Sequence, residues 1–164
     1  MERFFNTAGP QILADNYSID PLKRFGLDEI LSLIRQKRYF VLHAPRQTGK
    51  TSCMLALRDY LNEHGEYLAV YANVEGGQAS RNNVQNVVGA TCDTIAERFR
   101  QILKSDMPVN IKRELSDVNP DAKLATFLQR LSEAVDKPIV LMIDEIDALV
   151  GDSLVSVLRQ LRAG

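Results

Sequence analysis

The stretch VLHAPRQTGKT, residues 41–51, decides how the rest of the chain is interpreted. An apolar run over residues 39–42 precedes it, and an amphipathic segment over residues 52–63 follows it. Within the stretch, Ala44 and the triplet Gly49-Lys50-Thr51 stand at the spacing of a phosphate-binding loop, G-x-x-x-x-G-K-[ST], with alanine in place of the first glycine. A strand, a loop and a helix in that order form the context that this motif requires. The sequence therefore predicts a loop that binds phosphate.

The residue types of this loop suit the triphosphate tail of a nucleotide. Gly49 has no Cβ, so the backbone can approach a phosphate closely there. Consecutive N–H groups at the positive end of the following helix predict an anion nest. Lys50 would reach the β- and γ-phosphates, and the Thr51 hydroxyl would bind Mg²⁺. An ordinary surface loop, the alternative, accounts for neither the spacing nor the flanking strand. The expected nucleotide-binding residues are Ala44, Pro45, Arg46, Gln47, Thr48, Gly49, Lys50, Thr51 and Ser52, although the side chains at positions 46 and 47 are assigned no chemistry.

Composition favours one soluble domain with a substantial core, since the 164 residues are 45% hydrophobic and carry a net charge of −1. Neither sign of charge dominates, so affinity for nucleic acid or for a membrane surface is not indicated. Cys53 and Cys92 lie in helical patterns without metal-ligand spacing, which predicts reduced thiols in a cytoplasmic protein. We expect no membrane span and no signal peptide, because no apolar run approaches ~20 residues and the first residues lack a basic head before an apolar core.

Helical and strand-like patterns alternate along the chain after an irregular arm at residues 1–21. Such alternation predicts an α/β fold with a parallel sheet, whose ligand binds at the carboxyl ends of the strands. Residues 105–120 are expected to form a loop. Gly65 is expected to end the helix at residues 52–63, Asn119 to cap the helix that begins at Pro120, and Asp152 or Ser153 to cap the last helix. The expected helices cover residues 22–37, 52–63, 80–104, 120–136 and the segment after that cap, and the expected strands cover residues 39–43, 67–74 and 139–143.

The run Ile139-Val140-Leu141-Met142-Ile143-Asp144-Glu145 is an apolar strand that ends in two acids. Beside a phosphate loop, Asp144 would hold a water ligand of Mg²⁺. Glu145 would orient and deprotonate the water that attacks the phosphate. Two acids that merely end a strand in solvent are the alternative, and the upstream phosphate loop weighs against it.

The pairing of APRQTGKT with IVLMIDEID resembles the additional-strand, catalytic-glutamate class of P-loop ATPases, which includes AAA+ proteins. The segments FFNTAGP, YFVLHAPRQTGKTS, YANVEGGQ and LMIDEIDALVGDSLVSVLRQLRAG look like a bacterial AAA-like ATP-binding family, so the resemblance covers essentially the whole chain. It implies a three-layer α/β/α P-loop fold with ATP and Mg²⁺ as ligands. It also implies that Lys50 contacts the γ-phosphate, that Thr51 and Asp144 bind Mg²⁺, and that Glu145 is the catalytic base.

The same resemblance implies less specific roles for other residues. The arm before the first helix often contacts adenine in such proteins, and the candidates here are Tyr17, Leu22 and Arg24, with packing or solvent exposure as the alternative. Asn73 stands where AAA+ proteins can carry a polar residue that holds the catalytic glutamate. Glu75 is expected to be a solvated acid and His43 a buried, hydrogen-bonded histidine, rather than catalytic groups.

The chain departs from this class in one respect. Such enzymes build five strands in the order 5-1-4-3-2, whereas the sequence supplies three and ends at Gly164. Strands four and five, the γ-phosphate sensor and any arginine finger are therefore missing from it. The expectation is a truncated ATPase domain over residues 22–164, in which the strand at residues 39–43 lacks both of its neighbours.

Three functions remain open at this point. The chain is part of an ATP-hydrolysing enzyme, a nucleotide-binding regulatory module without turnover, or a small-molecule kinase. Glu145 argues against the kinase, because phosphate transfer to a substrate needs no water-activating acid. The GTPase patterns N-K-x-D and D-x-x-G do not occur, so ATP is preferred to GTP. Besides ATP, a second copy of the chain or another protein is left open as a partner.

Overall fold

The computed structural model describes residues 20–24, 26–45 and 47–163. Their fold is mixed α/β, mostly helical, with a small parallel sheet. The chain divides into two compact units, Met1–His64 and Gly65–Gly164, which are described separately below. None of the helices in the described ranges combines the length and the apolar composition that a membrane crossing needs.

The elements follow the chain in a simple order. The first unit contains helices α1 (Pro21–Arg24), α2 (Leu27–Arg35) and α3 (Lys50–His64). The second unit contains β1 (Leu68–Asn73), η1 (Glu75–Ser80), α4 (Val84–Leu103), α5 (Met107–Glu114), α6 (Pro120–Glu133), β2 (Ile139–Asp144), η2 (Ile146–Ala148) and α7 (Gly151–Ala163).

The single helix expected over residues 22–37 is interrupted, so that prediction is wrong in its extent. Gly26 has a left-handed backbone, with φ of 59°, and precedes α2. Its carbonyl accepts hydrogen bonds from the N–H groups of Glu29 and Ile30, which starts a new helix there. A left-handed residue cannot continue a right-handed helix, and glycine adopts this conformation without a Cβ clash.

The strand expected at residues 39–43 is wrong as well, because this segment is irregular in the structure. Its apolar run suggested a strand buried on both faces, yet Val41 is 78% exposed and Tyr39 is 51% exposed. A strand is defined by its ladder, and the sheet of the described residues consists of β1 and β2 alone.

Helix α3 is the main element of the first unit and was predicted from its apolar spacing. Cys53, Met54, Leu57 and Leu61 are buried along one face. The Cys53 thiol donates to the carbonyl of Pro21, with 3.5 Å between Sγ and O, and so connects α3 to α1. After the helix, Gly65 has φ of 75°, which confirms the glycine expected at its C-terminus.

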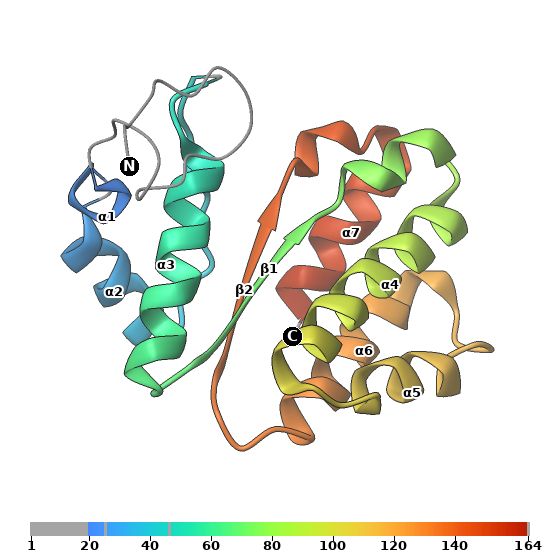
Figure 1. Ribbon diagram of the computed structural model, residues 1–164. Coiled ribbons are helices and arrows are strands. Elements are labelled where there is room, and N and C mark those ends of the chain that lie inside the picture. The colour runs from blue at the N-terminus through green and yellow to red at the C-terminus, as the bar shows by residue number, and fades with distance from the viewer. Residues whose placement is uncertain (1–19, 25, 46, 164) are drawn as a thin grey trace, which may run out of the picture. The chain divides into compact units, whose positions relative to one another are not determined.

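The sheet of the second unit pairs β1 with β2 in parallel, from Leu68 opposite Ile139 to Asn73 opposite Asp144. Both strands were predicted from their apolar runs. The segment between them contains α4, α5 and α6, because parallel neighbours need a long crossover. Figure 1 shows these helices and α7 gathered on one side of the two strands.

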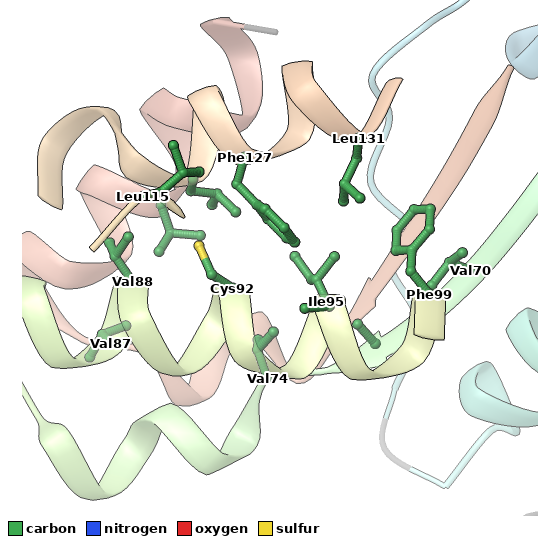
Figure 2. Close-up of a cluster of buried hydrophobic side chains, with 14 of the residues drawn as sticks. Val70, Val74, Val87, Val88, Cys92, Ile95, Phe99, Leu115, Phe127 and Leu131 are labelled. Carbon is green, nitrogen blue, oxygen red and sulfur yellow. The ribbon is translucent and has the colours of Figure 1, made fainter. Parts of the chain in front are cut away.

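The core of the second unit lies between that face of the sheet and the helices. Val70 and Val74 of the β1 segment pack with the apolar face of α4, and α6 also packs against that helix. In Figure 2, Ile95 and Phe99 of α4 point towards Leu131 of α6. Cys92 is fully buried here, and burial raises the pKa of its thiol to about 12. The further members of the core are Leu68, Ala72, Val87, Val88, Ala96, Leu115, Leu124, Phe127, Leu149 and Val157.

Residues 105–120 are not the loop that their weak pattern suggested, since they contain α5. Pro108 stands in the first turn, where its missing N–H is not needed. Leu115 just after the helix is fully buried, and Met107 and Ile111, on the same side, are partly buried against the core. Surface ion pairs from Lys112 to Asp93 and from Arg130 to Glu114 connect α5 to its neighbours. Tertiary packing therefore selects a helix that the local pattern did not indicate.

Of the caps predicted for the last two helices, one is present and the other is not. Asn119 caps α6 as expected, since its Oδ1 accepts from the N–H of Asp121 at 2.9 Å. Helix α7 begins at Gly151, so Asp152 and Ser153 lie inside its first turn and do not cap it. Instead, Oδ1 of Asn82 accepts from the N–H of Ser153 at 3.3 Å. A residue distant in the sequence thus supplies the cap.

Candidate functional site

The predicted phosphate loop has a backbone suited to an anion. Gln47 and Gly49 have positive φ values of 60° and 83°, and α3 starts at Lys50. Alternation between left- and right-handed residues turns successive N–H groups towards one side, which is the geometry of an anion nest. Cys53 N–H donates to the Gly49 carbonyl at 2.9 Å, so the helix ladder begins directly at the loop. The positive end of the α3 dipole therefore lies where the motif places the phosphates.

Side-chain contacts hold this loop together. Lys50 Nζ donates to the Ala44 carbonyl at 2.9 Å, which connects the two ends of the motif. The Thr48 hydroxyl donates to the Pro45 carbonyl at 2.7 Å. The Lys50 ammonium thus binds a neutral carbonyl of the loop. An anionic phosphate oxygen would outcompete this carbonyl, because its negative charge attracts the ammonium more strongly.

The other predicted loop residues are placed in part. Thr51 and Ser52 lie in the first turn of α3, and both are half-buried. Gln47 is exposed. Arg46 lies outside the described residues. The structure therefore describes eight of the nine predicted positions, and it keeps them in one continuous loop and helix start.

The two acids lie at the carboxyl end of β2. Asp144 is only 7% exposed, and its Oδ1 accepts from the N–H of Glu145 at 3.0 Å. Its Oδ2 accepts from the hydroxyl of Tyr71 at 2.9 Å. Glu145, the next residue, is exposed. One carboxylate is thus buried and oriented, and the other is open to solvent.

Glu145 has an unusual backbone for its residue type, with φ of 57° and ψ of 33°. Left-handed conformations are uncommon outside glycine and cost of order 1 kcal/mol or more. The residue precedes η2, and its carbonyl accepts from the N–H of Ala148 at 3.1 Å. Such strain is concentrated at functional sites, which is a second, independent reason to examine this acid.

The structure agrees with the expectation for some of the remaining candidate residues and contradicts it for another. Asn73 is opposite Asp144 in the sheet, so it lies at the same edge as Glu145. Its Oδ1 accepts from the N–H of Glu75 at 2.8 Å, which is a local turn contact, and Glu75 is exposed as expected. His43 was expected to be buried, and this is wrong, because the side chain is exposed in the irregular segment that replaces the strand.

Of the three adenine candidates, the structure describes the side chain of Leu22 alone. Tyr17 and the side chain of Arg24 lie outside the described residues. Leu22 is half-buried in α1, where its N–H donates to Oδ1 of Asp20 at 3.0 Å. It lines a surface hollow of about 640 Å³ formed by α1, the beginning of α2 and the turn between them. Adenine contact by this residue stays a prediction.

A metal held by protein side chains alone does not fit the described part of the chain, where no three His, Cys, Asp or Glu residues gather at one point. Magnesium in nucleotide enzymes is different, because one or two protein oxygens and the substrate phosphates bind it together with several waters. The Thr51 hydroxyl in the first unit and the Asp144 carboxylate in the second are each an oxygen donor of that kind. The types of residue present therefore suit a magnesium ion delivered with a nucleotide.

Two buried or half-buried polar residues were missed by the sequence reasoning. Tyr71 was treated only as part of an apolar strand, although its alternation with Asn73 puts it on the face of the sheet that carries Asp144. Gln160 on α7 is 3% exposed and binds the backbone at the start of α6. No local sequence signal indicates the contact of Gln160 with α6, since the partners of Gln160 are more than thirty residues away in the chain.

Comparison with known proteins gives one clear result. The family model described as "Nephrocystin 3, N-terminal" matches residues 26–163. No curated protein matches the chain, and no solved structure does. The match takes in the whole loop at residues 44–52 and both acids, as well as every element from α2 onwards. Because this match covers most of the residues of the chain, the chain belongs to the Nephrocystin 3, N-terminal family.

Proposed function

We propose that the chain binds Mg-ATP through the loop at residues 44–52. The observation that carries the proposal is the geometry of this loop, in which positive φ values at Gln47 and Gly49 lead directly into the N-terminus of α3. This backbone is matched by the G-K-T residue types at Gly49, Lys50 and Thr51. An isolated lysine or an isolated helix N-terminus would carry no such inference, whereas the combination is what phosphate recognition needs.

We further propose that a protein carrying this chain hydrolyses ATP. Lys50 would stabilise the charge on the γ-phosphate, and Thr51 and Asp144 would hold Mg²⁺, which neutralises charge on the phosphate oxygens. Glu145 would accept a proton from the attacking water, a role that its solvent exposure permits. The strained backbone of Glu145 favours this function over a nucleotide-binding module without turnover, because strain at a merely solvated acid has no use.

The finer family assignment is part of the same proposal. We propose an AAA-like, three-layer P-loop fold with the strand order 5-1-4-3-2. In that order β1 and β2 would be the second and third strands, which are neighbours. The parallel pairing of β1 with β2 therefore supports the proposal. The irregular segment at residues 39–43 would become the first strand once its two neighbours are present. A crystal structure of a longer chain with all five strands would test this, and a first strand adjacent to β1 would contradict it.

Replacing Lys50 with alanine tests nucleotide binding. The variant loses a charge-assisted contact to phosphate worth about 1.5–3 kcal/mol, so the affinity for Mg-ATP should fall roughly ten-fold to a hundred-fold in a calorimetric titration. Lys137→Ala, at an exposed lysine just before β2, is the matched control and should bind like the wild type. Unchanged ATP affinity in the Lys50→Ala protein would contradict the proposal.

Replacing Glu145 with glutamine tests hydrolysis. The residue acts on the water and contributes only in the transition state, so binding should be preserved. In a protein with all five strands, turnover should fall at least ~100-fold, the usual scale for loss of a general base. If turnover stays at the wild-type rate, another residue is the base. If the wild type binds ATP without any turnover, the regulatory module is the correct reading.

A further inference from the structure

The face of the sheet that points away from the core cluster carries an unassigned residue. Alternate residues of a strand point to opposite faces, and Tyr71 is opposite Met142 while Asn73 is opposite Asp144. The core cluster takes the other set, such as Val70 and Leu141. Tyr71 and Asp144 are therefore diagonal neighbours on one face, a separation that a long aromatic side chain can bridge.

The contact between them is direct and specific. The Tyr71 hydroxyl donates to Oδ2 of Asp144 at 2.9 Å, and the N–H of Glu145 donates to Oδ1 at 3.0 Å. Each carboxylate oxygen thus has its own donor, so the plane of the group is fixed as well as its position. These two donors are neutral, so they orient the carboxylate without themselves cancelling its charge. An oriented, charged carboxylate is what a metal ion requires from its ligand shell.

We propose that Tyr71 is the positioning residue for the Asp144 carboxylate in magnesium binding. This inference rests on the proposed function, because it assigns the partner that orients one of its metal-binding groups. The phenol would neither touch the metal nor react. It would hold Oδ2 in place, so that the carboxylate keeps one orientation towards the magnesium ion or its water. Mutation of partners of this kind typically lowers metal affinity or activity by roughly ten-fold to a hundred-fold.

Removing only the hydroxyl separates this role from simple packing. Tyr71→Phe keeps the ring, which fills the half-buried position in the sheet, and deletes the donor to Asp144. The probe is a fluorescent ATP analogue titrated with the chain at increasing Mg²⁺ concentration, and separately with a chelator present. The expected result is a half-saturating Mg²⁺ concentration about ten-fold higher than in the wild type, with unchanged affinity for the metal-free nucleotide.

Tyr67→Phe is the matched control. It makes the same chemical change just before β1, at a tyrosine whose side chain makes no hydrogen bond in the part of the chain that the structure describes. Its Mg²⁺ requirement should equal that of the wild type. A second comparison is made in the Asp144→Asn background, where the charge of the carboxylate is gone. There, Tyr71→Phe should not raise the half-saturating Mg²⁺ concentration further, because the two changes act through one group.

The outcomes are distinguishable. A raised Mg²⁺ requirement in Tyr71→Phe alone, abolished in the Asp144→Asn background, supports the inference. An unchanged requirement, or an equal loss of metal-free nucleotide affinity, overturns it while Mg-ATP binding stands. If the wild type shows no Mg²⁺-dependent nucleotide binding, both this inference and the proposed function are overturned. Thermal unfolding of each variant shows whether a loss of binding comes from a loss of folded protein instead, in which case the role is structural and the inference also fails.

Discussion

Replacing Gln160 with methionine should destabilise the second unit. The Gln160 amide binds both backbone groups that start the α6 ladder. Its Oε1 accepts from the N–H of Leu124 at 2.8 Å, and its Nε2 donates to the carbonyl of Pro120 at 2.9 Å. Gln160 is 3% exposed and Leu124 is fully buried, so water cannot take over these contacts. Methionine has a similar length and supplies neither a donor nor an acceptor of comparable strength.

The expected loss of unfolding free energy is about 1–3 kcal/mol, since two neutral hydrogen bonds contribute roughly 0.5–1.5 kcal/mol each. Relaxation favours the lower end, because the N–H of Leu124 and the carbonyl of Pro120 are four residues apart and can bond to each other in an α-helix. Weaker contacts of Gln160 to Ala125 N–H, at 3.4 Å, and to the Ser156 hydroxyl add little.

Urea denaturation followed by circular dichroism measures this change, and the chain contains no tryptophan that would report it by fluorescence. The Tm should fall by about 2–4 °C for each kcal/mol in a chain of this size. Gln129→Met is the matched control, since that side chain is exposed on α6 and bonds only Glu133 at the surface. Equal free energies of unfolding for the two variants, within ~0.5 kcal/mol, would refute the assigned role of Gln160.

Two further stability predictions concern the second unit. Gly77→Ala should cost about 1–3 kcal/mol of unfolding free energy, because the new Cβ would lie 2.9 Å from Cδ2 of the buried Leu149. Gly76→Ala is the control: its Cβ meets no atom within 4 Å, so it should be nearly neutral, and equal losses of unfolding free energy in the two variants would contradict the prediction. Burial, with a smaller contribution from Asp93, raises the pKa of Cys92 from 9.0 to about 12, so the unfolded chain loses this proton first as pH rises. Between pH 9.0 and about 12, the unfolding free energy of the wild type should therefore fall by about 1.4 kcal/mol per pH unit relative to that of Cys92→Ala. If the unfolding free energies of the two proteins change in parallel with pH, the prediction is wrong.

The sequence by itself determined those features whose physical cause is local. The G-K-T triplet and the helix after it depend on neighbouring residues, so α3 was predictable, although it starts at Lys50, two residues before the expected helix. The strands β1 and β2 were visible as short apolar runs, and the cap of α6 as an asparagine before a proline. The two acids of the candidate site follow from their position at the end of such a run.

Tertiary structure decided what depends on partners distant in the chain. The run at residues 39–43 has the composition of a strand, but a strand exists only where another strand completes its hydrogen bonds, and within the described residues β1 and β2 pair with each other instead. Helix α5 forms where the local pattern is weak, because Leu115 and its neighbours are buried against the core. The hydroxyl of Tyr71 reaches Asp144 only because a parallel register brings residues 73 positions apart onto one face of the sheet.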